Sequence, residues 1–199
     1  MGGETAQMPG MYKAGEYDIA GFCVGVVERK KIIDGSRIQA GDAVIGLASS
    51  GLHSNGYSLI RKVLSKEELR RMSSQLLMPT RIYVKPVLSL LRDKRLAISG
   101  ISHITGGSFY DKISRILPAD VDVKINKGSW PIPRIFRLIQ SKGNIEDKEI
   151  FHTLNMGIGM VLIVRPKARR DIIAKLKELK LQSWVIGRVV KGKGRVEVK

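Results

Sequence analysis

A histidine stands among small hydrogen-bonding residues in the segment 49–58, and this combination suits anion binding and proton transfer. The imidazole of His53 can donate a hydrogen bond, accept one or carry charge. Around it, glycines let a ligand approach the backbone, while hydroxyl and amide side chains add polar groups. The neighbours in question are Ser50, Gly51, Ser54, Asn55 and Gly56. Two interpretations follow: His53 moves a proton or orients a substrate, or it only holds its own loop in shape.

The residues on either side of this loop predict a strand followed by a helix. Residues 42–48 form a short apolar run bounded by turn residues, which is typical of a buried strand. After the loop, apolar residues recur at helical spacing over 56–65. Such a helix directs backbone N–H groups and the positive end of its dipole at the loop, where an anion is favoured. We expect Ser54 or Asn55 to cap it.

A second turn of the same kind is predicted at Thr105, Gly106 and Gly107, between a strand over 97–104 and a helix over 108–117. If the two strands end on the same side of a sheet, amides from both turns converge on one phosphate. His103 is expected to be structural and His152 to lie at the surface or in packing. No His, Cys or Asp cluster has metal-ligand spacing, so the sequence gives no support for a structural zinc site.

Predicted strands and helices alternate along the whole chain, which indicates a single layered α/β domain. The further predicted strands are 17–27, 121–125, 156–164 and a closing pair over 184–190 and 194–198. The further predicted helices are 80–91, 133–141, 146–154 and 168–179.

Composition places the chain among globular proteins. It has 199 residues, of which 43% are hydrophobic, enough to bury a sizeable core. No apolar run reaches the 18 or so residues that cross a bilayer, and no signal peptide is visible, so we expect no membrane partner and a cytoplasmic location. The single cysteine, Cys23, lies in an apolar run, and we expect a buried, inert thiol.

Positive charge is in large excess: the sequence has 35 Lys and Arg and 18 Asp and Glu, which gives a net charge of +17. Such a balance favours nucleic acids and anionic surfaces. The basic residues are scattered, however, and only 6% of residues are aromatic, so few bases could stack. We therefore expect weak binding at low salt and no sequence-specific nucleic acid partner. A basic nucleic-acid binder stays open as a rival, and salt-resistant binding to one preferred sequence would favour it.

The string Ser-Ser-Gly-x-His-Ser-Asn-Gly-Tyr-Ser at 49–58 resembles the signature of AIR synthetases, the phosphoribosylformylglycinamidine cyclo-ligases of purine biosynthesis. The similarity covers nearly the whole chain, and its landmarks come in the family's order. They include segments 2–12, 17–22, 79–83, 103–107, 115–118 and 184–187, and the pattern Asn155-x-Gly157-x-Gly159-Met160. The resemblance implies the family's C-terminal domain, a mixed sheet with helices packed on it.

The resemblance also implies a reaction. ATP phosphorylates the formyl amide oxygen of formylglycinamidine ribonucleotide, and an internal nitrogen then closes the imidazole ring and releases phosphate. The two turns would bind the ribose phosphate, and His53 would be the catalytic residue. Glu4 and Thr5 match the end of the family's ATP-binding domain, which makes both candidate contacts for ATP and Glu4 a candidate ligand of Mg²⁺. Complete family members are expected to be homodimers.

Family members carry a whole ATP-binding domain before Gly-Gly-Glu-Thr, and this chain begins there. Residues 1–14 therefore match the end of that domain and a linker, and residues 15–199 match the C-terminal domain. A fragment, a mis-called start and one half of a split enzyme are the alternatives. Each leaves an interface exposed, so we expect a partly apolar surface and self-association.

Several residues differ from the family pattern, and these differences put catalytic activity in doubt more than the fold. Gln7 replaces an acidic residue, and Ser108 replaces a third glycine, although its hydroxyl could cap the following helix. Lys112, Ser114 and Leu154 also differ from the expected residues. The rivals are thus a non-catalytic fragment or binding module of the same fold, and another enzyme of this ATP-binding superfamily, such as formylglycinamidine ribonucleotide synthetase or selenophosphate synthetase.

Overall fold

The computed structural model describes residues 2–199, which fall into two units, one ending at Ile32 and the other Ile33–Lys199. The first unit is extended apart from a short 3₁₀ helix, η1 (Arg29–Lys31). The strand predicted over 17–27 is wrong, because these residues pair with no neighbouring strand in the described part of the chain. A strand needs such a neighbour to satisfy its N–H and C=O groups. Cys23 is exposed, so the prediction of a buried thiol is also wrong.

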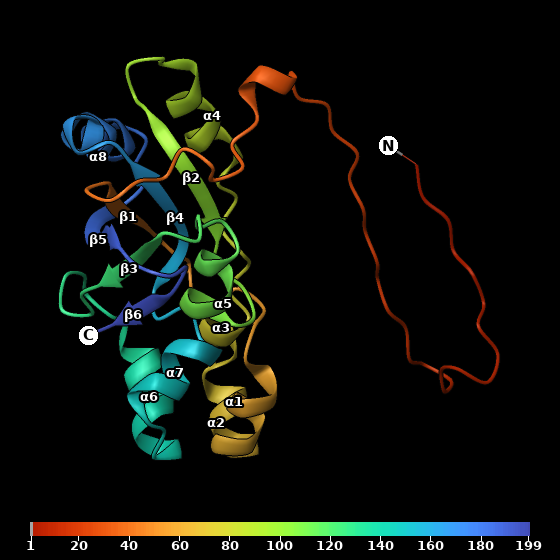
Figure 1. Cartoon of the computed structure of the whole chain (residues 1–199). Helices are drawn as coiled ribbons and strands as arrows, with labels where there is room; N and C mark the ends of the chain where they lie inside the picture. Colours follow the sequence, from red (N-terminus) through yellow and green to blue (C-terminus); the bar gives the residue numbers. More distant parts are fainter. Residues whose placement is uncertain (1) are drawn as a thin grey trace. The chain divides into compact units, whose positions relative to one another are not determined.

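The second unit is built on one six-stranded mixed sheet (Figure 1). Its strands are β1 (Ala43–Ala48), β2 (Ile98–His103), β3 (Val121–Ile125), β4 (Ile158–Val164), β5 (Ser183–Lys191) and β6 (Val196–Val198), in the spatial order β2-β4-β1-β5-β3-β6. All neighbours are antiparallel except β3 and β6. This confirms the predicted α/β fold class.

Strand direction brings the two predicted turns to one edge of the sheet. β1 and β2 both run antiparallel to β4, which lies between them, so both end on the same side. The closing pair predicted for the last two strands is wrong, since β3 lies between β5 and β6. The Asp122 carboxylate on β3 accepts the N–H groups of Lys193 and Arg195, each at 2.7 Å, and so holds the crossing chain on the far side of β3.

Helices cover the two faces of the sheet unequally. On one face, α4 and α8 pack over β1, β2 and β4 around a core that includes Ile45, Leu90 and Ile172. On the other, the remaining helices bury a larger core that includes Phe109 and Phe136. The helices are α1 (Tyr57–Val63), α2 (Lys66–Arg71), α3 (Ser73–Leu76), α4 (Val84–Arg92), α5 (Ser108–Ser114), α6 (Arg134–Gly143), α7 (Asp147–Thr153) and α8 (Arg169–Glu178), with a 3₁₀ helix η2 (Pro166–Ala168) before α8.

Two helical details differ from the sequence prediction. α4 begins at Val84 and not at residue 80, which puts Pro86 in the first turn, where its missing N–H breaks no helical bond. The polar stretch 66–75, for which no element was predicted, holds α2 and α3. A capping box between Ser65 and Glu68 starts α2 and is readable from the sequence. Among residues 2–199, no helix has the length and apolar character to cross a membrane.

Candidate functional site

The two predicted turns meet beside the start of β4. Just after β1, the N–H of Ser49 donates to the carbonyl of Gly157 at 2.8 Å, and just after β2, the N–H of Ile104 donates to the carbonyl of Gly159 at 2.9 Å. The Asn55 side chain faces the second turn: a Cβ on Gly106 would lie 3.4 Å from its Oδ1. Residues about fifty positions apart in the sequence therefore form one local surface.

The loop after β1 has an unusual backbone. His53 and Ser54 both adopt left-handed conformations, with φ of 54° and 63°, and Gly56 follows at 77°. Non-glycine residues rarely adopt this conformation unless their surroundings impose it. Gly56 is the N-cap of α1, with no side-chain cap, so the predicted cap by Ser54 or Asn55 is wrong. Asn55 turns back instead, and its Nδ2 donates to the carbonyl of His53 at 2.8 Å.

The first turn of α1 leaves backbone donors free. Within the described chain, the N–H groups of Tyr57, Ser58 and Leu59 have no hydrogen-bond partner, and the first helical bond is that from Ile60 to Gly56. Free N–H groups at the start of a helix favour an anion.

His53 is buried and acts as an acceptor at the centre of the loop. Its Nε2 accepts the N–H of Ser50 at 2.9 Å and the N–H of Arg81 at 3.2 Å, so the proton of the neutral ring is on Nδ1. Burial, then the nearby positive groups of His103 and Arg81, lower the pKa of His53 to about 4. The ring is thus neutral at physiological pH. These contacts favour the interpretation in which His53 holds its own loop.

The missing side chain of Gly159 leaves room for the His53 ring. A Cβ on Gly159 would lie 2.5 Å from Cε1 of His53, and would collide with the Tyr83 hydroxyl as well. That hydroxyl donates to the carbonyl of Ala48 at 2.8 Å, and burial raises the pKa of Tyr83. The ring of His103 packs edge-on against Tyr83, with 6.2 Å between centroids. Partial burial, then the nearby charge of Lys112, lowers the pKa of His103. The structural role expected for His103 stays a prediction.

Asn155 joins the loop to the start of β4, and sequence reasoning did not assign it to the site. Its Oδ1 accepts the Ser49 hydroxyl at 3.2 Å and the N–H of Gly157 at 2.8 Å, while its Nδ2 donates to the carbonyl of Gly51 at 2.8 Å. The side chain is buried. The pattern Asn155-x-Gly157-x-Gly159 was the available signal, because all three residues contact the loop or its support.

The second turn already holds a negative charge. Gly107, with φ of 82°, is the N-cap of α5, and a Cβ there would lie 2.6 Å from Cγ of Asp111. The Asp111 carboxylate also contacts Nε2 of His152 at 3.2 Å. The expected cap by Ser108 is wrong, since its buried hydroxyl donates to the carbonyl of Leu154 at 2.8 Å. An anion would therefore be less favoured at this turn than at the loop after β1.

Glu4 and Thr5 belong to the first unit and are exposed. Residues 2–199 contain no group of three or more His, Cys, Asp or Glu side chains that could hold a metal ion. Glu4 therefore does not make a metal site with the residues described here, and its roles toward Mg²⁺ and ATP stay predictions.

Curated relatives of this chain are cyclo-ligases. It is 52% identical over 207 residues to phosphoribosylformylglycinamidine cyclo-ligase of Thermoanaerobacter sp. (strain X514), covering 98% of this chain and 61% of that protein. The enzyme of the same name from Pseudothermotoga lettingae is 52% identical over 201 residues, covering 96% and 59%. The chain thus spans about 60% of the length of these curated relatives.

Solved structures agree with the fold. Thiamine-monophosphate kinase from Stenotrophomonas maltophilia K279a matches with a TM-score of 0.60 at 18% identity, over 87% of this chain and 54% of that one. Hydrogenase maturation protein HypE in complex with ATP matches with a TM-score of 0.61 at 17% identity, over 82% and 49%. The family model for the AIR synthase related protein, C-terminal domain, matches residues 39–199, and the chain belongs to this family.

Proposed function

We propose that this chain is the substrate-phosphate-binding part of a phosphoribosylformylglycinamidine cyclo-ligase. The observation that carries the proposal is the junction of the two turns around His53 and Asn155, in a chain half identical to cyclo-ligases. The ribose phosphate of formylglycinamidine ribonucleotide binds at Ser50, Gly51, Ser54, Asn55 and Gly56, with the free amides at the start of α1. Thr105, Gly106 and Gly107 border the same phosphate from the second turn.

Arg81 supplies the positive charge for this phosphate. Its backbone N–H is bound to His53, and its guanidinium is near enough to help lower the pKa of that ring. Its Nε is buried and has no partner among residues 2–199. A guanidinium beside this loop is well suited to a phosphate. His53 therefore serves the reaction by positioning Arg81 and the loop, and as a neutral ring it gives up no proton near pH 7.

In the proposed reaction, the γ-phosphoryl group of ATP moves to the formyl amide oxygen, which makes that oxygen a leaving group. The internal nitrogen then bonds to the same carbon, the C–O bond breaks, and phosphate departs. Mg²⁺ would offset the charge of the ATP phosphates. Most ATP and Mg²⁺ contacts would come from the part of the relatives that this chain does not span. Two solved relatives in fold, HypE with ATP and Thermotoga maritima PurL with AMPPCP, support the use of a nucleotide.

The exposed segment 17–27 supports a partner that completes the enzyme. Its apolar side chains Ile19, Phe22, Val24 and Val26 are 85–101% exposed. Exposed apolar surface of this kind marks an interaction site. We propose that the ATP-binding part, in the same polypeptide or as a separate subunit, covers this segment, and that the complete enzyme is a cytoplasmic homodimer.

The test is reconstitution. The chain is mixed with the ATP-binding part of the Thermoanaerobacter enzyme, and aminoimidazole ribonucleotide is measured with ATP and formylglycinamidine ribonucleotide present. We expect product, and an Arg81→Gln variant that raises KM for the ribonucleotide about tenfold or more. Arg70→Gln removes the same charge from the exposed surface of α2 and should leave KM unchanged. No product from a folded, associated pair would contradict the proposal.

A non-catalytic binding module is the second candidate. Asp111 favours it, since its carboxylate lies against Gly107, opposes a phosphate at the second turn and leaves only the loop after β1 to hold the ribonucleotide. In that case the associated pair binds formylglycinamidine ribonucleotide by calorimetry and makes no product. Turnover at a rate that Arg81→Gln reduces would exclude this alternative.

A further inference from the structure

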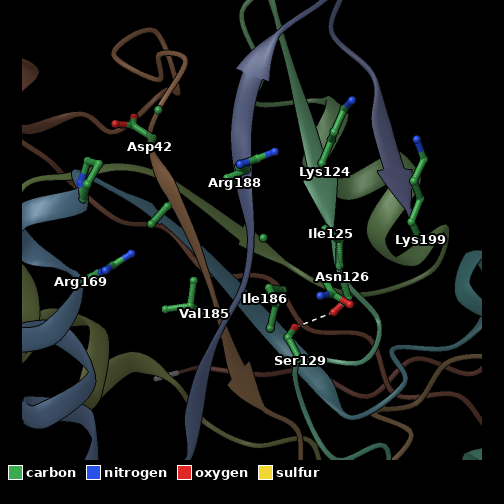
Figure 2. Close-up of a pocket in the computed structure, with 14 residues that line it drawn as sticks. Asp42, Lys124, Ile125, Asn126, Ser129, Arg169, Val185, Ile186, Arg188 and Lys199 are labelled. Carbon is green, nitrogen blue, oxygen red and sulfur yellow. Dashed lines mark hydrogen bonds between the residues drawn. The ribbon is translucent and has the colours of Figure 1, made fainter.

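A second basic site lies on the sheet face that α4 and α8 leave uncovered. These helices pack over β1, β2 and β4, so the outward side of β5 and β3 is exposed, including Val185, Arg188 and Lys124. A cavity of about 720 Å³ opens there, lined from β1, β3, β5 and the start of α8 (Figure 2). It borders Ala43, at the opposite end of β1 from the phosphate loop. The length of that strand separates the two sites by roughly 17 Å.

Like charges stand opposite each other on two neighbouring strands that line this cavity. Lys124 on β3 and Arg188 on β5 are register partners on neighbouring strands. Such pairs destabilise a sheet unless an opposite charge lies between them. Among residues 2–199, neither Arg188 nor Arg169, which lines the cavity from α8, forms an ion pair.

The acidic residues near the cavity are already engaged. Asp42 is buried in its wall, where it accepts hydrogen bonds from Arg165 at 2.8 Å and from the Ser99 hydroxyl at 3.1 Å. Glu197 on β6 lies 2.8 Å from the ammonium of Lys199 and 3.9 Å from that of Lys124. One carboxylate thus serves two lysines. The cavity retains an excess of positive charge, which belongs mainly to the two arginines.

The cavity also has an apolar side chain, that of Val185, and an amide, that of Asn126. Val185 exposes its side chain there, while the side chains of Ile125 and Ile186 lie in the core on the other face of the sheet. Asn126 and Ser129 border the cavity (Figure 2). Its size is that of a small-molecule site, in the range of about 300–1,000 Å³. None of the described residues that line it is aromatic, so it lacks the platforms on which bases of single-stranded nucleic acid stack. The combination favours a compact anion with an apolar part over a polymer.

We propose that this cavity binds a phosphorylated small molecule of nucleotide size, with its phosphates between Lys124, Arg188 and Arg169 and its apolar part on Val185. Binding removes the repulsion between the opposed cations, which gives the ligand a favourable energy that surface lysines and arginines elsewhere do not offer. The site is independent of the substrate-phosphate loop and of the reaction proposed above.

Backbone amide NMR on the full chain tests this proposal, with ATP without metal and inorganic triphosphate as separate probes. We expect saturable shifts at Lys124, Asn126, Gly187 and Arg188. The double variant Lys124→Gln with Arg188→Gln should weaken ATP binding about tenfold or more. If triphosphate binds as tightly as ATP, the phosphates alone account for the affinity. If ATP binds more tightly, its apolar part also contributes by packing on Val185. Either result supports the site. The same spectra contain the amide signals of Gly51 and Gly56. Absence of ligand binding at the phosphate loop is therefore detected independently of binding at this cavity.

The control is a second double variant, Lys66→Gln with Arg137→Gln, which removes equal charge from α2 and α6, outside the cavity. It should bind ATP as the unmodified chain does. The cavity variant removes a repulsion, so its melting temperature should not fall. Equal weakening in both variants, absence of saturable shifts at the cavity, or shifts there with an oligonucleotide and none with ATP would each overturn the proposal.

Discussion

The imidazole of His53 lies directly against the α-carbon of Gly159, and the structure leaves no space for a methyl group between them. Gly159→Ala should therefore displace a ring that organises the loop. Small-to-large changes in a packed interior typically cost about 1–3 kcal/mol, and we expect a loss of this size in the free energy of unfolding, measured in urea. Gly128→Ala, where the nearest atom would be 3.4 Å away, should change it by less than about 0.5 kcal/mol.

Burial of neutral His53 should make stability depend on pH. Its pKa is about 4 in the folded protein, against an ordinary 6.5, so between these values the unfolded chain binds more protons. The free energy of unfolding should thus fall as pH drops from about 6.5 to 4, by roughly 3 kcal/mol from this residue at about 1.4 kcal/mol per pKa unit.

Urea titrations at several pH values between about 4 and 6.5 measure this change in the free energy of unfolding. His53→Gln keeps an acceptor but not the titration, so its stability should vary less with pH than that of the unmodified chain. The exposed His152 offers a comparison, since His152→Gln should retain the full dependence. Identical pH profiles for the unmodified chain and His53→Gln would contradict the assignment.

Asp111 should weaken the binding of phosphate at the second turn, because its carboxylate lies against Gly107. Asp111→Asn removes that charge with little change in shape, and we expect ribose 5-phosphate to bind several-fold more tightly by calorimetry. Asp120→Asn, an exposed residue before β3, provides the matched loss of charge. Equal gains in the two variants would show that only the net charge of the chain matters.

The buried carboxylate of Asp42 should be a major contributor to stability. It accepts hydrogen bonds from Arg165, the Ser99 hydroxyl and the N–H of Gln39. Removing one partner of a buried pair costs about 3–5 kcal/mol, and we expect a loss approaching this range for Asp42→Ala in thermal or urea unfolding. Asp93→Ala, which breaks a pair with the exposed Arg95, should cost much less. Comparable losses would mean that burial of Asp42 is unimportant.

The sequence by itself determined the order of the elements, the fold class and the position of the phosphate loop. Apolar periodicity marked β1, β3, β4 and α8 close to their observed bounds, because each signal lies within a few consecutive residues. The glycines and small polar residues between β1 and α1 likewise marked the loop, since they set the backbone locally.

Only the tertiary structure decided what holds that loop and which strands are neighbours. Asn155 contacts Gly51 across 104 positions in the sequence, and Arg81 contacts His53 across 28. Such contacts depend on how the sheet places distant segments, which no local pattern encodes. The segment 17–27 shows the same limit. Its apolar residues predicted a strand, but a strand forms only where a neighbouring strand supplies the hydrogen bonds.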